Sequence, residues 1–456
     1  MNNLKISCAH ALVGQEWRDD VVLGVDEAGM IRDVRQHQEE TPGEWLSGFV
    51  VPGMPNVHSH GFQQLIAGLA APGSGQGQDS FWSWRQAMYA LATSMGPAEY
   101  QVCLSWVYLY MLKSGFTSCA EFHYLHHQAD GTPFAQKEEM SLRIIAAAET
   151  TGMPLTLLPV LYQHAGFGEQ APEQQQRRFV NSLDGYLDLL DRLQKAIDTR
   201  SAVRLGIAPH SLRAVPRNVI RALDEAVTEA MPRHMHIAEQ SAEVRESIFY
   251  LGARPIEWLA DEVDLDEHWT LIHATHAQSH ELERLARRGV SLGLCPMTEA
   301  DLGDGLFPVD DWLEMDGKVA VGSDSNVRIS PAGELRQLEW GERLRTGRRN
   351  VLARRGHSVA ETLYARCCSA GATAINQPSG LLSKGLRADL VELDEQHPLL
   401  RGCRPEQVLE RWVFSGGEDM IKSVWVAGKP VVVNGKHPAE DDIQSKYLRL
   451  RGRIGL

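Results

Sequence analysis

Two histidines separated by one residue, His58 and His60, form the first motif of the chain that could do chemistry. They follow an apolar, strand-like run, and alternate residues of a strand point to the same side of a sheet. Both imidazoles are therefore expected to face one point in space. His236 and Asp324 each follow another strand-like run. Three imidazoles and one carboxylate suit a divalent ion such as Zn²⁺ and leave a position for water.

Glu239 and His273 are the candidate proton-handling groups beside these ligands. Glu239 comes three residues after His236, so on a continuous strand the two side chains would face opposite sides. The chain must leave the strand there, which places Glu239 on a loop next to the metal. A carboxylate in that position can take a proton from activated water and pass it to a leaving group. His273 closes a further strand-like run and is expected to orient the water or stabilise developing charge.

The elements that must position these residues alternate along the chain. Helix-like stretches with 3.6-residue apolar spacing include 97–114, 133–151, 175–199, 215–229 and 278–288. The strand-like runs cover residues 48–60, 117–127, 155–163, 204–212, 232–240, 269–276, 290–300 and 319–326. This order predicts an α/β fold with a (β/α)8 TIM barrel, in which chemistry lies at the carboxyl ends of the strands. An open doubly wound sheet is the alternative, although no glycine-rich phosphate-binding motif follows an early strand.

Each candidate residue also has an ordinary structural explanation. A single histidine can be a satisfied core residue, and Asp324 can cap a helix or close a turn. These explanations do not account for the common position of the candidates at strand ends.

Both ends of the chain consist of short strand-like segments and turns. Residues 21–34 contain a hairpin pattern, and 388–394 and 423–435 contain further strands. Neither end is long enough to bury a core alone. We therefore expect 1–50 and 380–456 to form one small β-sandwich domain beside a catalytic barrel domain at 51–379.

A segment rich in glycine, serine and glutamine, residues 72–80, follows the first strand of the predicted barrel. It is interpreted either as a plain flexible linker or as a lid over the site.

Composition limits the partners of the protein. The 456 residues include 45 Lys plus Arg and 59 Asp plus Glu, which gives a net charge of −14. This charge disfavours nucleic acid and anionic membranes as partners, but permits a small anionic substrate held by local cations. Seven scattered cysteines without a CxxC pair predict free thiols in a reducing compartment. With neither a signal-peptide pattern nor a long apolar run, a cytoplasmic enzyme is expected.

The combined pattern resembles the amidohydrolase superfamily. It shares the HxH of the first strand at His58 and His60, the fifth-strand His236, the sixth-strand His273 and the eighth-strand Asp324. The resemblance covers nearly the whole chain and implies the barrel with its small β domain.

The fourth strand-like run contains His210 and no lysine that could bridge two metals. The resemblance therefore implies the deaminase-like branch with a single divalent ion, expected to be zinc. Because the family is commonly dimeric, a homodimer is expected.

Within that branch, the segments 81–89, 120–127, 208–215 and 234–240 resemble deiminases of bacterial histidine degradation. Their substrate is a small dianionic amino-acid derivative, and guanidinium groups match carboxylates well. The resemblance implies catalytic roles for Glu239, His273 and Asp324. It implies substrate contacts for Gln63, Arg85, Tyr124, His210 and Arg213. Which arginine meets which carboxylate stays open.

Two other functions are compatible with parts of the sequence. A related deaminase acting on a purine, pyrimidine or triazine ring would favour aromatic stacking, for which Phe81, Trp82 and Trp84 are candidates. A noncatalytic scaffold could keep the barrel, but such proteins usually lose metal ligands, and all of the candidates are present here.

Overall fold

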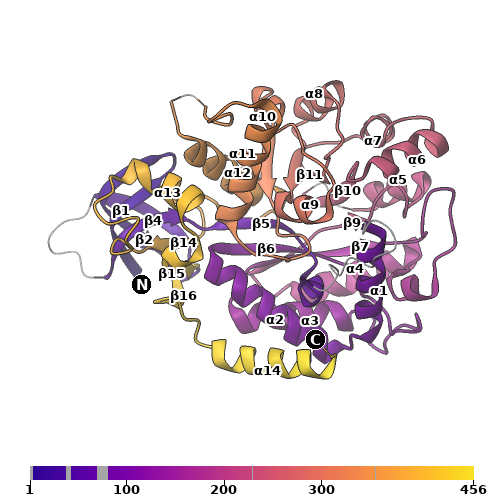
Figure 1. The fold of residues 1–456 in the computed structure, drawn as a ribbon. Helices are drawn as coiled ribbons and strands as arrows, with labels where there is room; N and C mark the ends of the chain where they lie inside the picture. The colour runs from indigo at the N-terminus through magenta and orange to yellow at the C-terminus, as the bar shows by residue number, and fades with distance from the viewer. Residues whose placement is uncertain (1–3, 37–42, 69–80, 228–229, 355, 456) are drawn as a thin grey trace.

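A computed structural model describes residues 4–36, 43–68, 81–227, 230–354 and 356–455. Eight parallel strands surrounded by helices form its centre (Figure 1). These strands are β5 (Met54–Ser59), β6 (Phe116–His123), β7 (Leu155–Leu161), β8 (Val203–Leu205), β10 (Arg233–Ile237), β11 (Trp269–His273), β12 (Ser291–Leu294) and β13 (Lys318–Val321). A two-residue strand, β9 (Ala208–Pro209), continues the path of β8 and pairs with β7.

The strands form two parallel sheets that meet at two seams. At one seam the His60 amide donates to the Asp324 carbonyl over 2.8 Å, and the Asp324 amide donates to the His58 carbonyl over 2.9 Å. At the other, the His234 amide donates to the Ile207 carbonyl over 2.9 Å. The eight strands therefore follow one another around a ring, and the predicted (β/α)8 barrel is confirmed. One seam lies directly at the predicted metal ligands.

The first strand-like run, 48–60, is divided between two sheets, which corrects the prediction of a single barrel strand. Its first part belongs to β4 (Glu44–Pro52) of the terminal sheet, and β5 begins at Met54. Gly53 lies at the division, where a Cβ atom would come within 2.1 Å of Thr117 Oγ1. Only glycine permits this close passage from one sheet to the other.

Helices cover the outside of the barrel. They are α1 (Phe81–Ser94), α2 (Pro97–Ser114), α3 (Glu139–Thr151), α4 (Leu183–Ile197), α5 (Arg217–Ala226), α6 (Ser241–Leu251), α7 (Pro255–Glu262), α8 (Ser279–Arg287), α9 (Pro296–Leu302), α10 (Val309–Glu314), α11 (Pro331–Thr346) and α12 (Val359–Ala374). Two 3₁₀ segments, η1 (Gly61–Ile66) and η2 (Gln174–Phe179), lie on the connections after β5 and β7.

Two of the predicted helical stretches are shorter than expected. The stretch 133–151 becomes helical only at Glu139. The stretch 175–199 is not one helix, because Ser182 ends the connection after η2 and caps α4 by accepting from the Gly185 amide over 3.1 Å. Apolar periodicity does not detect such an internal cap.

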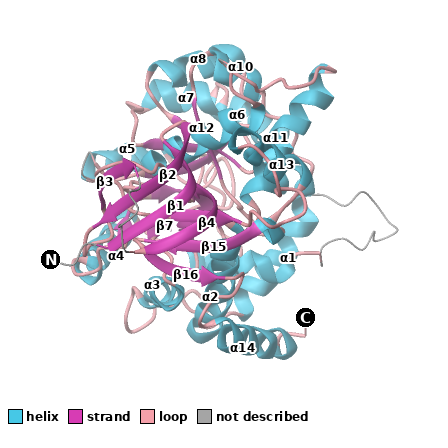
Figure 2. Ribbon diagram, turned by 90° about the vertical axis from the view of Figure 1, so that its left-hand side faces the viewer, coloured by secondary structure: helices cyan, strands magenta, loops and turns pink. Residues whose placement is uncertain are grey.

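The two ends of the chain share one seven-stranded sheet in the order β16-β15-β14-β4-β1-β2-β3 (Figure 2). Its remaining strands are β1 (Leu4–Val13), β2 (Glu16–Val25), β3 (Ile31–Gln36), β14 (Leu390–Leu393), β15 (Ile421–Val426) and β16 (Lys429–Val433). Most neighbours are antiparallel, but β1 and β4 are parallel. Hydrogen bonding joins all seven strands, and residues from both ends of the chain form a separate buried cluster that includes Ile6, Leu23 and Leu390. The predicted union of the two ends is therefore confirmed.

The last two helices leave this sheet and pack on the barrel. α13 (Val408–Ser415) follows the short η3 (Pro405–Gln407), and η4 (Glu418–Met420) precedes β15. α14 (Glu440–Arg453) lies along α2 (Figure 1), where Lys113 and Glu440 form an ion pair of 2.5 Å and Tyr447 stacks on Trp106.

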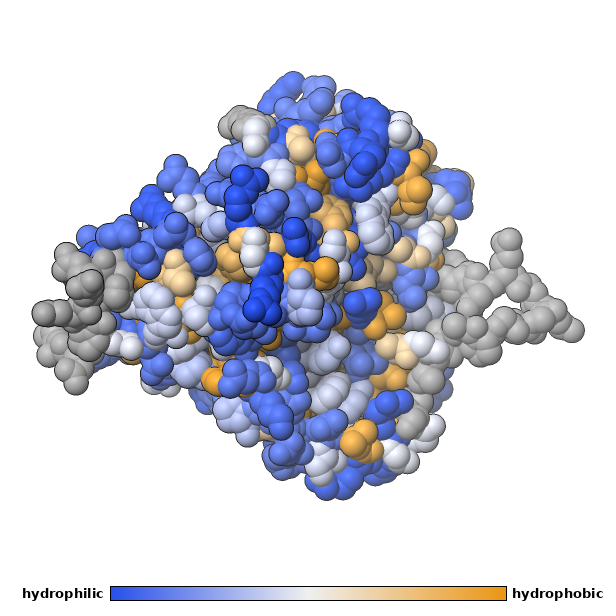
Figure 3. Space-filling model, turned by 60° about the vertical axis from the view of Figure 1, so that its left-hand side comes forward, coloured by the Kyte–Doolittle hydropathy of each residue, from blue (hydrophilic) through white to orange (hydrophobic). Residues whose placement is uncertain are grey.

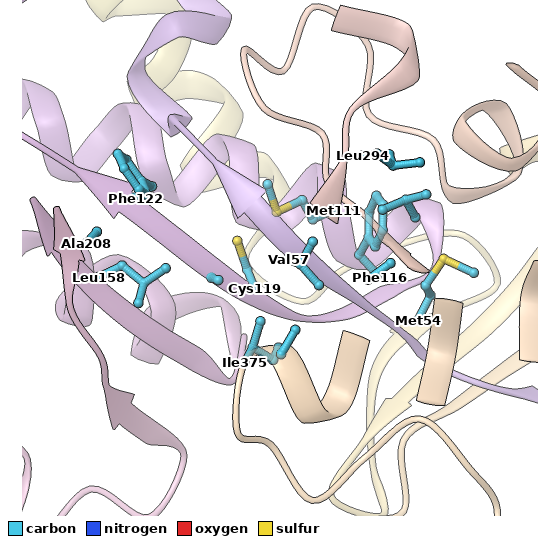
Figure 4. Packing of buried hydrophobic residues seen from close by; sticks show 14 of the residues in the cluster. Met54, Val57, Met111, Phe116, Cys119, Phe122, Leu158, Ala208, Leu294 and Ile375 are labelled. Carbon is cyan, nitrogen blue, oxygen red and sulfur yellow. The ribbon is translucent and has the colours of Figure 1, made fainter. Parts of the chain in front are cut away.

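Apolar side chains fill the core of the barrel and the layer between its strands and helices (Figure 4). Val57, Cys119, Phe122 and Leu158 are fully buried in this core, on three neighbouring strands. The packed interior leaves the strand ends as the place for a site.

The outer surface differs from this interior. The face shown in Figure 3 is mostly hydrophilic, with apolar residues in small separate patches. Among the helices of the described ranges, none is long and apolar enough to cross a bilayer. All seven cysteines are free thiols, as the sequence predicted.

Candidate active site

The four predicted metal ligands meet at one point at the carboxyl ends of β5, β10 and β13. The Nε2 atom of His236 lies 3.0 Å from that of His58 and 3.3 Å from that of His60. Asp324 Oδ1 lies 3.5 Å from His58 Nε2 and 3.3 Å from His60 Nε2. Ligands at the Zn–N distance of about 2.0 Å in a tetrahedron are separated by roughly 3.3 Å. These four distances are close to that spacing and are compatible with ligands of a single divalent ion.

Backbone carbonyls fix two of the three imidazoles in the form that a metal requires. His60 Nδ1 donates to the Phe122 carbonyl over 2.8 Å, and His236 Nδ1 donates to the His210 carbonyl over 3.1 Å. Because Nδ1 carries the proton, the Nε2 lone pair is directed to the common point. Burial lowers the pKa of all three histidines, that of His58 to about 3. The three imidazoles are therefore neutral at physiological pH and can act as metal ligands.

The backbone around this point is strained. Ala238, His273, Ala274 and Asp324 have φ angles of 50°, 70°, 50° and 46°, in the left-handed region that non-glycine residues rarely adopt. Such residues cost about 1–3 kcal/mol each and gather at functional sites. Here they mark the points at which β10, β11 and β13 turn away and direct their side chains into the site.

Glu239 and His273 face each other beside the ligands. Glu239 Oε1 lies 3.7 Å from His273 Nε2, which in turn lies 4.0 Å from Asp324 Oδ2. Glu239 follows the end of β10 and precedes α6, so it lies on the loop where the sequence placed it. Its amide donates to Glu243 Oε2 over 3.0 Å, which holds this loop in place.

The charges of these two groups are linked. Burial raises the pKa of Glu239, and the neighbouring His273 opposes that rise. Burial alone would lower the pKa of His273, but the carboxylates of Glu239, Glu299 and Asp324 raise it to about 10. A carboxylate and an imidazolium in contact can hold a proton between them near a reacting atom.

The five predicted substrate-contacting residues line one pocket together with this centre. Gln63 lies on η1, where its amide donates to the Tyr124 hydroxyl over 2.7 Å. Arg85 lies on α1 and Arg213 on the loop after β9. His210 is at the end of β9, with its ring 4.9 Å from that of His236. The pocket is lined by His60, Gln63, Trp84, Arg85, Met88, Tyr89, Tyr124, Tyr162, Phe179, His210, Arg213, His236, Glu239, His273, Leu302 and Asp324.

Arg213 is the cation nearest to the proton-handling pair. Among the described residues, no carboxylate oxygen lies within 4.0 Å of its guanidinium. Burial lowers the pKa of Arg213, whereas the negative charges of Glu243 and Glu239 raise it. The net effect is a raised pKa. Its charge is thus available to an anion in the pocket.

Sequence reasoning missed several residues of the pocket. Glu299 accepts from His273 Nδ1 over 3.2 Å, and Tyr89, Tyr162 and Phe179 form part of the wall. The strand-end rule could have found Glu299 and Tyr162, since both follow barrel strands closely. Tyr89 and Phe179 lie on α1 and η2, and apolar spacing gives no sign that they face a pocket.

Two hypotheses drawn from the sequence concern residues that the structure does not describe. Residues 72–80, interpreted as a linker or lid, lie outside the described residues, as do the side chains of Phe81 and Trp82. Trp84 is described and lines the pocket.

A barrel that gathers three histidines and an aspartate at its strand ends, beside a buried glutamate, defines a class of metal-dependent hydrolases. The chain belongs to the amidohydrolase family, whose sequence profile matches residues 49–431. The family resemblance drawn from the sequence is confirmed.

Particular relatives narrow this class. The chain is 42% identical over 450 residues to the formimidoylglutamate deiminase of Pseudomonas aeruginosa, covering 98% of this chain and 99% of the relative. A crystal structure of an amidohydrolase from Brucella melitensis superimposes with a TM-score of 0.94 at 40% identity, covering 99% of this chain and 100% of the other. An adenosine deaminase from Xanthomonas campestris with bound zinc shares the fold, with a TM-score of 0.82 at 20% identity over 99% of this chain and 98% of the other.

Proposed function

We propose that this enzyme hydrolyses N-formimidoyl-L-glutamate to N-formyl-L-glutamate and ammonia, a step of histidine degradation. The likeness to a formimidoylglutamate deiminase over nearly the whole of both chains supports this substrate. The observation that carries it in the structure is the presence of two guanidinium groups, Arg85 and Arg213, in the pocket that holds the metal ligands. A substrate with two carboxylates matches two such groups.

The ligand set would hold one divalent ion, and we assign zinc. Three neutral imidazoles and a carboxylate whose donor atoms lie close together are typical of zinc. When bound at this point, such an ion supplies Lewis acidity and lowers the pKa of water toward neutrality.

The residues of the chain then carry the proton and hold the substrate. Water attacks the formimidoyl carbon, and Glu239 takes its proton. His273, hydrogen bonded to Glu299, stabilises the negative charge that develops on oxygen. Glu239 passes this proton to the departing nitrogen, then takes the remaining hydrogen of the hydroxyl and passes it to the same nitrogen. As the C=O bond forms, the C–N bond to that nitrogen breaks and ammonia leaves. We assign Gln63, Tyr124 and His210 as neutral hydrogen-bonding contacts and the two arginines as carboxylate contacts.

A panel of substrates tests this proposal. Ammonia release is measured with N-formimidoyl-L-glutamate, guanine, cytosine and adenosine, using the zinc-loaded enzyme. We expect turnover of the first compound alone. Turnover only of a ring would overturn the substrate assignment and favour the aromatic wall of Trp84, Tyr124 and Phe179 as a stacking surface. If zinc-loaded protein turns over none of these compounds, the result would favour the alternative of a noncatalytic scaffold.

Three further assignments belong with this function. We propose a homodimer, from the family resemblance, and analytical ultracentrifugation of the full chain measures it. The seven free thiols support our assignment of the enzyme to the cytoplasm, where thiols stay reduced. We also propose the division into a terminal β domain at 1–50 and 380–456 and a barrel at 51–379, which limited proteolysis can test.

A further inference from the structure

A buried amide joins two tyrosines on the pocket wall opposite the metal ligands. Gln176, on η2, donates from Nε2 to the hydroxyl of Tyr89 over 2.9 Å and to the hydroxyl of Tyr162 over 2.9 Å. Its Oε1 accepts from the Glu173 amide over 2.8 Å. Gln176 is 1% exposed, so water does not compete for these bonds. The backbone bond fixes which end of the amide faces the tyrosines, because only an oxygen can accept from an N–H.

Counting hydrogens shows what the tyrosines can still do. Both hydroxyl oxygens accept from Gln176, and the oxygen of Tyr89 also accepts from Arg85 Nε over 2.5 Å. Among the described residues neither hydroxyl donates a hydrogen bond to another side chain or to the backbone, so each keeps its hydrogen for an acceptor in the pocket.

The surroundings of these hydrogens favour an anion as their acceptor. Arg85 Nε donates to the Tyr89 hydroxyl over 2.5 Å, and Arg213 lines the same pocket as both tyrosines. A carboxylate in contact with a guanidinium and a tyrosine donor forms short, charge-assisted hydrogen bonds. A neutral substrate group would gain much less at this position.

We propose that Tyr89 and Tyr162 donate hydrogen bonds to a substrate carboxylate, and that Gln176 is the positioning residue that directs these donors into the pocket. The inference rests on the proposed function, because it takes N-formimidoyl-L-glutamate as the dicarboxylate. It adds neutral donors to the two arginines and gives η2 a part in substrate selection.

The first experiment removes both hydroxyls. In the Tyr89→Phe/Tyr162→Phe double variant of the zinc-loaded enzyme, we expect KM for N-formimidoyl-L-glutamate to rise at least about tenfold, the size of a lost hydrogen bond to a charged group. The kcat should stay within about threefold of the parent, since neither tyrosine touches the reacting atoms. Each single variant leaves one hydroxyl that can still donate, so each single rise should be smaller than the rise in the double variant.

The second experiment reverses the direction of the donors. Gln176→Glu keeps the shape of the side chain but turns Nε2 into an acceptor, which draws the hydroxyl hydrogens away from the pocket. We expect a rise in KM at least as large as in the double variant. Gln174→Glu, an exposed residue of the same η2 segment with the same change of charge, is the control and should leave KM unchanged.

Two analogues identify the acceptor. N-formimidoyl-L-glutamine lacks the side-chain carboxylate, and N-formimidoyl-4-aminobutyrate lacks the α-carboxylate. The loss of kcat/KM in the double variant should persist with one analogue and disappear with the other. Equal losses with both, or a KM within twofold of the parent in both the double variant and Gln176→Glu, would overturn the inference. Failure of the parent enzyme to hydrolyse N-formimidoyl-L-glutamate would instead overturn the proposed function.

Discussion

The two sides of the pocket are built in different ways. One side consists of strand ends: His58 lies on β5 and His60 follows it, His236 lies near the end of β10, and Asp324 follows β13. The other side, with Arg85 and Phe179, comes from α1 and η2, which are helical segments placed on the connections between strands. Strands are held by ladders of backbone hydrogen bonds, whereas inserted segments can change without disturbing the ring. The comparison indicates that the strand ends carry the reaction, whereas the inserted segments add Arg85 to the proposed substrate contacts that Tyr124, His210 and Arg213 make from loops after strands.

The strand side should be the more sensitive to a single substitution. We expect Asp324→Asn to reduce the metal content and to lower kcat by at least roughly a thousandfold, or about 4 kcal/mol, because a neutral amide is a poor ligand. Metal analysis and ammonia release measure the two effects. Asp301→Asn, an exposed carboxylate on α9, is the matched control. An active Asp324→Asn enzyme without metal would show that the strand side does not carry the reaction.

Removal of the Glu239 carboxylate should affect kcat, which reports the chemical step, much more than KM. In Glu239→Gln we expect kcat to fall about 100- to 10,000-fold, the usual contribution of general acid–base catalysis. Metal content should change little, since Glu239 is not a ligand, and KM should change far less than kcat, since Glu239 carries the proton and is not assigned to a substrate carboxylate. Steady-state kinetics with metal analysis, alongside the exposed Glu246→Gln control on α6, measure this. A large rise in KM with normal kcat would assign Glu239 to the binding side.

The arginines should show the opposite pattern. For Arg213→Met and Arg85→Met we expect KM for the dianion to rise about 10- to 100-fold, as a charge-assisted contact is lost. Metal content should be retained. Arg217→Met, which removes an exposed cation paired with Glu262, provides the comparison variant. Unchanged KM in both pocket variants would remove the arginines from substrate binding and leave the inserted side without a carboxylate site.

The difference between the two sides also explains what could be predicted from the sequence. The side chains at the strand ends follow simple rules. The alternation of His58 and His60, and the position of Asp324 after an apolar run, predict that these side chains point into the site. The ring itself was predictable for the same reason. The residues brought by inserted segments are different: Tyr89 faces the pocket because of how α1 docks, and Gln176 lies in a turn of 3₁₀ helix that apolar spacing merged with α4. Only tertiary packing determines these positions. Gln63, Arg85, Tyr124 and Arg213 were expected through family resemblance, and spacing alone would not have selected them.

A carboxylate beneath the strand side gives a smaller test, in stability and not in turnover. Glu121, on β6, is fully buried and accepts from the Gly61 amide over 2.7 Å, next to the metal ligand His60. Burial raises its pKa from 4.5 to about 7. Between these values the folded chain keeps a proton that the unfolded chain releases, so this group makes stability fall as pH rises from about 4.5 to 7. A shift of this size corresponds to about 3 kcal/mol.

Glu121→Gln should remove this dependence, because the amide is neutral at every pH and its oxygen can still accept from Gly61. Urea unfolding at pH 5 and pH 8 measures the free energy of unfolding of both chains. We expect the variant to gain on the parent by up to about 3 kcal/mol as pH rises, with kcat at pH 7 within about threefold of the parent. Parallel pH profiles would show that Glu121 is not held in its neutral form. A gain without loss of activity would show that the strand side keeps a destabilising buried carboxylate that holds the chain following His60. The inserted side has no such cost, because its buried Gln176 and Tyr89 are neutral.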